Sequence, residues 1–160
     1  MALSDIYVTR QTVTLAATTS TALASLYGTA AKRLWLVGVR VKVLQTGAVA
    51  GNDITFTLAR PNATNTGTGL ASGNAHDFSA PASIGQIAVA WSTAPVAGLI
   101  LAEYVLPQTS GSMWEEFPPG GDEWGVPAVA NANINAGVHL FGQATVATST
   151  PVSVDFIWSE

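Results

Sequence analysis

The sequence predicts an all-β protein of about eight or nine strands, an antiparallel β-sandwich with a barrel as the alternative. Three observations support this fold class. Apolar and polar residues alternate with a period of two over several segments, helical periodicity is weak, and turn-rich segments separate the alternating stretches. The chain has 160 residues, which is enough for one domain with a sizeable hydrophobic core.

Residues 1–10 are expected to form an extended N-terminal arm ahead of a single domain that covers residues 11–160. The strand-forming residues of this arm suit the addition of a strand to the sheet of a neighbouring subunit. A disordered end and pairing within the same chain are the alternatives. Ile6, Tyr7 and Arg10 are candidate contacts with another subunit or a larger partner.

The clearest strand is predicted at residues 33–44, where apolar residues occupy every second position. The residues expected to face the core are Trp35, Val37, Val39, Val41 and Val43. Arg40 and Lys42 have the opposite parity, so they should project together from the outer face of the strand as a small basic patch.

The remaining strands are predicted from the same alternation or from short apolar runs between turns. They lie at residues 11–16, 53–60, 85–91, 98–106, 112–117, 122–126, 138–146 and 152–158. In the last of these strands Trp158 shares the parity of the apolar residues and is expected in the core.

Two further segments are not assigned to long strands. Residues 18–31 are rich in Ala and Thr and are predicted to be a loop, with a short helical turn as the alternative. Residues 61–83 form a long polar connection, and a connection of this length is expected to hide a short strand, around residues 75–79.

Charge is scarce and unevenly distributed. Only 10% of the residues are charged, against roughly 25% in an average soluble protein. Six cations and two acids give the first 60 residues a charge of +4, and eight acids without a cation give the rest −8. A hundred residues without Lys or Arg argue against a nucleic-acid partner, because phosphate binding needs clustered cations.

Several other classes are also excluded by composition. The apolar runs are far shorter than the roughly 20 residues of a membrane helix, so no membrane partner is expected. The N-terminus lacks the basic start and apolar stretch of a signal peptide. Because the chain has no cysteine, it has neither a disulfide framework nor a thiolate metal site, and we expect it to fold in a reducing cytoplasm.

Motifs for catalysis are weak. His76 lies in a polar loop and His139 lies on the polar parity of its strand, so both are expected to face solvent or an interface. Neither a Gly-x-Ser-x-Gly elbow nor a phosphate-binding Gly-x-x-x-x-Gly-Lys pattern is present. We expect no enzyme activity, no catalytic residue, no metal and no cofactor.

The most concentrated polar feature is the segment 113–127, which is interpreted as a hairpin with acidic and aromatic arms. Its candidate interaction residues are Trp114, Glu115, Glu116, Asp122, Glu123 and Trp124. We favour tryptophans that fill the core or a subunit seam while the acids face water. An interaction surface, a calcium site and a pair of glycosidase carboxylates are the alternatives.

The low charge indicates that much of the surface is covered in an assembly, since interface cores are depleted in charged residues. The short strands, the long loops rich in Thr, Asn and Gly, and the C-terminal segment Gly137 to Glu160 resemble jelly-roll proteins of tailed-phage particles, in particular head decoration (capsid cement) proteins. The resemblance covers about residues 11–160.

This resemblance implies a jelly-roll-like sandwich that forms a homotrimer and binds the major capsid protein on the outside of the virion, after synthesis in the host cytoplasm. Arg40 and Lys42 are then candidate contacts with the shell. The main alternative is a tail or fibre-tip module that binds a host carbohydrate through exposed Trp91, Trp114 or Trp124. A cellular oligomer of tumour-necrosis-factor-like or lectin-like type is a third interpretation.

Overall fold

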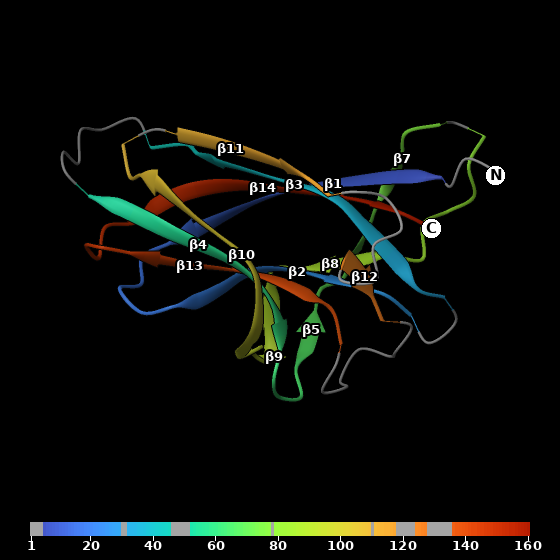
Figure 1. Cartoon of the computed structure of the whole chain (residues 1–160), viewed down its shortest axis with the longest axis horizontal. Coiled ribbons are helices and arrows are strands. Elements are labelled where there is room, and N and C mark those ends of the chain that lie inside the picture. The colour runs from blue at the N-terminus through green and yellow to red at the C-terminus, as the bar shows by residue number, and fades with distance from the viewer. Residues whose placement is uncertain are drawn as a thin grey trace.

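The computed structural model describes residues 5–29, 32–45, 52–77, 79–109, 111–117, 124–127 and 136–160. These residues form a sandwich of two antiparallel β-sheets, which lie one above the other in Figure 1. No α-helix occurs among the described residues. The predicted fold class, an all-β antiparallel sandwich, is confirmed.

The first sheet has the strand order β11-β3-β14-β1-β7, and β12 also pairs with β3. Its strands are β1 (Ile6–Leu15), β3 (Leu34–Val43), β7 (Asn74–Ala75), β11 (Gly111–Glu116), β12 (Gly125–Val126) and β14 (Thr150–Ser159). The second sheet has the order β10-β4-β13-β2-β8-β6. Its strands are β2 (Thr21–Tyr27), β4 (Asp53–Pro61), β6 (Ala71–Ser72), β8 (Gln86–Ala88), β10 (Ala97–Pro107) and β13 (Val138–Ala144). A separate ribbon pairs β5 (Thr66–Thr68) with β9 (Ala90–Thr93).

The longer strands have jelly-roll connectivity. In chain order they are β1, β2, β3, β4, β10, β11, β13 and β14. Counted in that order, the first sheet reads 6-3-8-1 and the second sheet reads 5-4-7-2. Each sheet therefore pairs early strands with late ones, as in the double Greek key of a jelly roll.

β14 provides much of the core. Its side chains alternate as predicted, and four of them are at most 1% exposed: Val152, Val154, Phe156 and Trp158. The Trp158 ring stacks with Tyr7 of β1 at a centroid distance of 6.1 Å. Gly73 and Gly85 lie against the same ring, because a Cβ atom at either position would overlap it.

The C-terminal Glu160 fastens the loop before β8 to this part of the core. Its carboxylate accepts hydrogen bonds from the Ser83 hydroxyl (2.6 Å), the Gly85 amide (2.9 Å) and the Trp158 indole (3.0 Å). Burial raises the pKa of Glu160, but these hydrogen bonds outweigh burial and leave the pKa below its ordinary value.

A bulge in β3 changes which side chains face the core. Ile157 pairs with Gly38 and Trp158 pairs with Leu36, so β3 has one extra residue between them. The core-facing residues of β3 are Leu34, Leu36, Val39, Val41 and Val43. The parity prediction is therefore correct beyond the bulge and wrong before it, where Trp35 is only half-buried.

The expected arm is not separate from the domain. β1 starts at Ile6 and pairs with β14 along its whole length, from Ile6 opposite Ser159 to Leu15 opposite Thr150. Tyr7 of β1 and Trp158 of β14 are buried in the same hydrophobic core, so this segment is part of the domain and pairs within the chain. The boundary at residue 10 is corrected accordingly, and residues 1–4 lie outside the described part of the chain.

Two other local predictions need correction. The segment predicted as a loop at 18–31 contains β2, a strand between β13 and β8. Its residues Leu23 to Tyr27 are all buried, so it shows no alternation in the sequence. The predicted strand at 85–91 is divided between β8 and β9, which belong to different sheets.

Replacing Gly73 by Ala is expected to destabilise the fold by about 1–3 kcal/mol, because the added methyl group would overlap the buried Trp158 ring. Urea denaturation followed by tryptophan fluorescence measures the change. Gly111→Ala is the matched control, since its Cβ atom would lie 3.3 Å from the nearest atom. An unchanged unfolding midpoint for Gly73→Ala would show that the Trp158 ring is free to shift.

Candidate functional site

The outer face of the first sheet carries a row of side chains that strand register places side by side. Arg10 in β1 lies opposite Asp155 in β14, which lies opposite Arg40 in β3. Arg40 in turn lies opposite Trp114 in β11. All four residues have the polar parity of their strands, so their side chains emerge on the same face as near neighbours.

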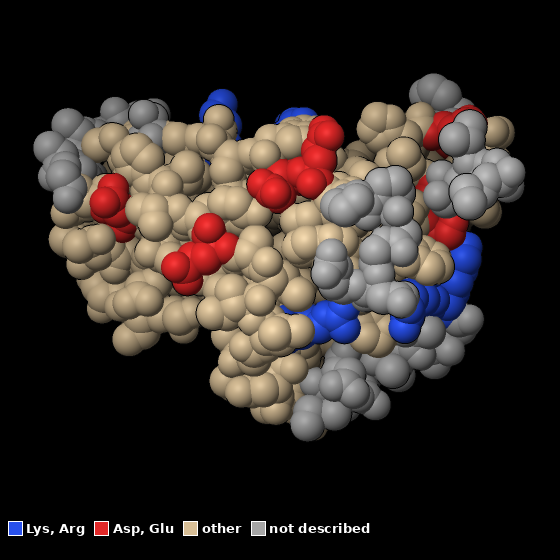
Figure 2. Space-filling model, in the orientation of Figure 1, with Lys and Arg blue, Asp and Glu red and all other residues tan. Residues whose placement is uncertain are grey.

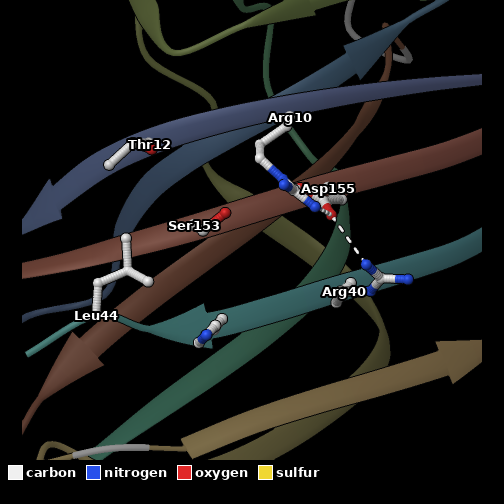
Figure 3. Close-up of a pocket in the computed structure, with 7 residues that line it drawn as sticks. Arg10, Thr12, Arg40, Leu44, Ser153 and Asp155 are labelled. Carbon is white, nitrogen blue, oxygen red and sulfur yellow. Dashed lines mark hydrogen bonds and ion pairs between the residues drawn. The ribbon is translucent and has the colours of Figure 1, made fainter.

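Asp155 holds the two arginines of this row. Arg10 donates from Nε and Nη2 to the two carboxylate oxygens of Asp155, each at 2.9 Å, and Arg40 Nη1 lies 3.6 Å from Oδ2. Figure 3 shows the two guanidinium groups reaching toward the carboxylate from the flanking strands. Asp155 is 3% exposed, and its hydrogen bonds raise the pKa of Arg10.

A shallow hollow of about 380 Å³ lies over this row. It is lined by Arg10, Thr12, Arg40, Lys42, Leu44, Ser153 and Asp155. We call the surface formed by Arg10, Arg40 and Lys42 around Asp155 the basic face. Its three cations and one carboxylate leave a net charge of +2. The predicted basic patch of Arg40 and Lys42 is therefore present, and Arg10 belongs to it.

Trp114 extends the row to the edge of the sheet. The side chain is 45% exposed, and the Arg40 guanidinium carbon lies 3.9 Å from the centroid of its ring. Its indole donates to Glu116 Oε1 at 2.8 Å. One face of the ring is therefore occupied by a cation–π contact, while the side chain stays partly exposed to solvent.

The segment 113–127 is not a hairpin. β11 and β12 do not pair with each other but with successive parts of β3, with Glu116 opposite Gly38 and Gly125 opposite Trp35. The prediction was wrong because β3 is long enough to pair with both arms, which then run in the same direction along its edge. Asp122 and Glu123 lie outside the described residues.

The remaining candidates of this segment point away from the basic face. Trp124 stacks on Phe117 at a centroid distance of 4.0 Å and packs against the core. Glu115 lies opposite the core-facing Val39, and its carboxylate acts on Tyr104 of β10 in the second sheet. Burial and the Glu115 carboxylate raise the pKa of Tyr104 to about 12. Trp124 and Glu115 therefore lie between the two sheets and do not form a surface with Trp114.

Two of the three candidate contact residues near the N-terminus are accessible to a partner. Tyr7 is fully buried, and its hydroxyl donates to the carbonyl of Pro81 at 2.9 Å. Ile6 is 41% exposed and Arg10 has a side chain that is 66% exposed. The structure therefore brings Arg10 together with Arg40 and Lys42 and removes Tyr7 from the candidate surface.

A second polar cluster lies buried between β13 and the β5–β9 ribbon. The His139 ring is 2.7 Å from the Ser25 hydroxyl through Nδ1 and 2.9 Å from the carbonyl of Ala136 through Nε2. Because a carbonyl only accepts, Nε2 carries the proton and Nδ1 accepts from Ser25. The Trp91 indole donates to the same hydroxyl at 3.0 Å.

Tyr27 and Asn65 complete this buried cluster. The Tyr27 hydroxyl donates to Asn65 Oδ1 at 2.6 Å, and Asn65 Nδ2 donates to the carbonyl of Ala136 at 3.3 Å. The expectation that His139 faces solvent is wrong, because the ribbon covers the outer face of β13 at this point and leaves the ring 0% exposed. Burial lowers the pKa of His139 to about 4.

This cluster has the Ser–His hydrogen bond of a nucleophile and base, but Ser25 and His139 are both 0% exposed. Its geometry supports a structural role, which is to fasten the β5–β9 ribbon to the second sheet. Trp91, a candidate for exposure, is half-buried and belongs to this cluster. No spacing pattern in the sequence indicates that Ser25, Asn65 and His139 lie in one cluster.

Among the described residues, no three His, Asp or Glu side chains lie close enough together to hold a metal ion. No helix in the described part of the chain could span a membrane. No protein-family model and no curated protein matches this chain.

Replacing Asp155 by Asn is expected to cost about 1–3 kcal/mol of stability, because it leaves Arg10 and Arg40 without their shared carboxylate. Arg10→Gln should cost less, since the Arg10 side chain is largely exposed and Asp155 retains Arg40. Urea denaturation of the two variants measures both changes. Equal losses would contradict the central position given to Asp155.

Acid is expected to weaken the fold through His139. The unfolded chain takes up a proton on this ring near its ordinary pKa of 6.5, whereas the folded chain does so only near 4. Stability should therefore fall by about 3 kcal/mol as the pH drops between these two values. His139→Gln keeps a donor for Ala136 but does not titrate in this range. Its stability, measured by urea denaturation across that pH range, should fall less steeply with acid, and parallel curves would refute the assignment.

Proposed function

We propose that this chain is a structural virion protein that binds the outside of a phage capsid as an oligomer and stabilises the shell. The observation that carries the proposal is the basic face. There the pairing of β1 and β3 with β14 places Arg10, Arg40 and Lys42 on the same face of the first sheet. A jelly-roll sandwich with a basic outer face and a low overall content of charged residues suits attachment to a protein surface.

The basic face is preorganised for a partner that carries carboxylates. Asp155 fixes the Arg10 and Arg40 guanidinium groups before binding, so less side-chain freedom is lost in the complex. Arg10 has five N–H donors and uses two of them on Asp155. The remaining donors of the face are available to acidic side chains of a shell protein.

The proposed mechanism is mechanical. A protein that binds the assembled shell and not its free subunits stabilises the assembled state by mass action. When the bound protein is an oligomer, several copies of the basic face contact the shell together, and avidity multiplies a modest affinity of each copy. No reaction is required of the chain.

Carbohydrate binding by a tail or fibre-tip module is the second candidate function, and Trp114 alone favours it. Trp114 has an exposed ring on the surface of the sheet, whereas Trp124 is stacked on Phe117 and Trp91 is hydrogen-bonded to Ser25. A glycan array that detects binding by the wild type but not by Trp114→Ala would support this function over shell attachment.

Replacing Lys42 by Gln is expected to weaken binding to purified heads of the encoding phage roughly three- to tenfold, because an exposed cation of the basic face is lost. Co-sedimentation of the protein with heads measures the affinity. Lys32→Gln is the matched control, since Lys32 is exposed and lies outside the basic face.

The same assay with wild-type protein decides the proposal as a whole. Occupancy of the heads that falls as salt is raised would agree with attachment through the basic face. Equal affinities of the Lys42→Gln and Lys32→Gln variants would move the contact elsewhere. A wild-type chain that fails to bind the heads would exclude the proposed function.

A further inference from the structure

We propose that the outer edge of β10 binds a second copy of this chain through the unpaired edge of that copy's β1. The proposal concerns contacts between copies and does not depend on attachment to a shell. It arises from two strand edges, one on each side of the sandwich, that have main-chain groups without strand partners among the described residues.

β10 is a long end strand. It has 11 residues, and among the described residues it pairs with β4 alone, regularly from Ala102 to Pro107 and with shifts in register between Ala97 and Ala102. Gln108 donates its amide hydrogen to the carbonyl of Asn52 at 2.8 Å, so the even-numbered residues of this regular stretch face β4. Glu103 and Val105 therefore direct their amide N–H and C=O groups away from β4, toward the outer edge.

The side chains beside this edge are apolar. Among the described residues, eight large hydrophobic side chains are exposed, and four of them lie between residues 96 and 105. These four are Val96 (52%), Leu99 (65%), Ile100 (55%) and Val105 (59%). Figure 2 shows this side of the molecule, which is mostly uncharged and carries separate acidic groups, with Lys and Arg side chains toward the lower right of the view. Long apolar edges of this kind are contact sites, because natural edge strands are otherwise blunted by Lys or Pro.

The complementary edge belongs to β1. β7 pairs with β1 only at Tyr7 and Val8, so within the described part of the chain the stretch from Thr9 to Leu15 has a strand partner on one side only. Pro151, which lies opposite Thr14, directs its carbonyl to Leu44 of the segment after β3. By the alternation of the antiparallel ladder, Thr14 then directs its N–H and C=O groups outward.

The charged residues favour pairing of β10 with the β1 edge of a second copy over pairing of β10 with the β10 edge of that copy. Glu103 is the single charged residue of β10, and Arg10 is the single charged residue of β1. Two β10 edges placed together would bring two copies of Glu103 into one contact. Pairing β10 with β1 brings Glu103 toward Arg10, whose side chain is 66% exposed and retains free donors beside Asp155.

The two edges lie on opposite sides of the sandwich. β10 and β11 end the two sheets on one side, whereas β1 and β2 lie toward the other side. A contact between unlike edges is head-to-tail, so each added copy presents a new unpaired edge. Such contacts produce a closed ring when the rotation between copies closes and a filament when it does not.

Two proline variants test the inference, because proline removes one outward N–H group without breaking the ladder on the inner side. Val105→Pro blocks the β10 edge and Thr14→Pro blocks the β1 edge. Light scattering with size-exclusion chromatography should show an oligomer for the wild type and a monomer for each variant alone. An equimolar mixture of the two variants should form a dimer, since each retains the edge that the other lacks.

A third variant controls for general loss of apolar surface. Val89→Lys changes an exposed apolar residue outside both edges and should leave the oligomer intact. Circular dichroism and thermal unfolding confirm that each variant is folded. A monomeric wild type overturns the proposal, and so does a Thr14→Pro variant that associates by itself, because that result indicates β10 pairing with β10. The Lys42→Gln variant in the head-binding assay reports separately on the basic face, because Lys42 belongs to β3 and lies on neither of the two edges.

Discussion

The sandwich depends on the burial of β14 between β1 and β3. One face of this strand supplies four apolar side chains that are almost fully buried, each of which contributes roughly 1.5–3 kcal/mol. Its other face supplies Asp155, which joins the two neighbouring strands through Arg10 and Arg40. The same strand thus fixes the packing between the sheets and the arrangement of the outer surface.

Several of the few charged residues make specific contacts within the fold. Asp155 organises the outer face, Glu160 fastens the loop before β8, and Glu115 reaches Tyr104 in the other sheet. Buried neutral groups do the rest of this work, as in the cluster around His139 that holds the β5–β9 ribbon. Only 10% of the residues are charged, so much of the remaining surface is uncharged.

Sequence periodicity predicted most of the long strands, because half-buried strands such as β4 and β14 alternate regularly. It failed where a second layer covers the outer face. β2 and His139 are buried on the side that should have been exposed, since neighbouring strands or the ribbon lie over them. The bulge between Leu36 and Gly38 could not be predicted either, because an extra residue in one strand is defined only by its pairing with the partner strand.

Only part of the candidate site could be predicted, because the alternation within a strand assigns its side chains to a face but does not identify the neighbouring strands. Arg40 and Lys42 could be assigned to one face from their own strand. Arg10 and Asp155 joined them only through pairing with strands far away in the sequence, and alternation within a single strand does not identify its neighbours. The misassigned hairpin at 113–127 has the same origin, since both arms pair with β3.

The position of β14 also has a consequence for biosynthesis. Arg10 and Asp155 are separated by 145 residues, so β14 leaves the ribosome long after β1 and β3. Until it arrives, β1 and β3 have no common neighbour, and both sides of the gap expose unpaired main-chain groups. The first sheet therefore assembles only after β14 has been synthesised, and the edges of β1 and β3 are open to pairing between nascent chains until then.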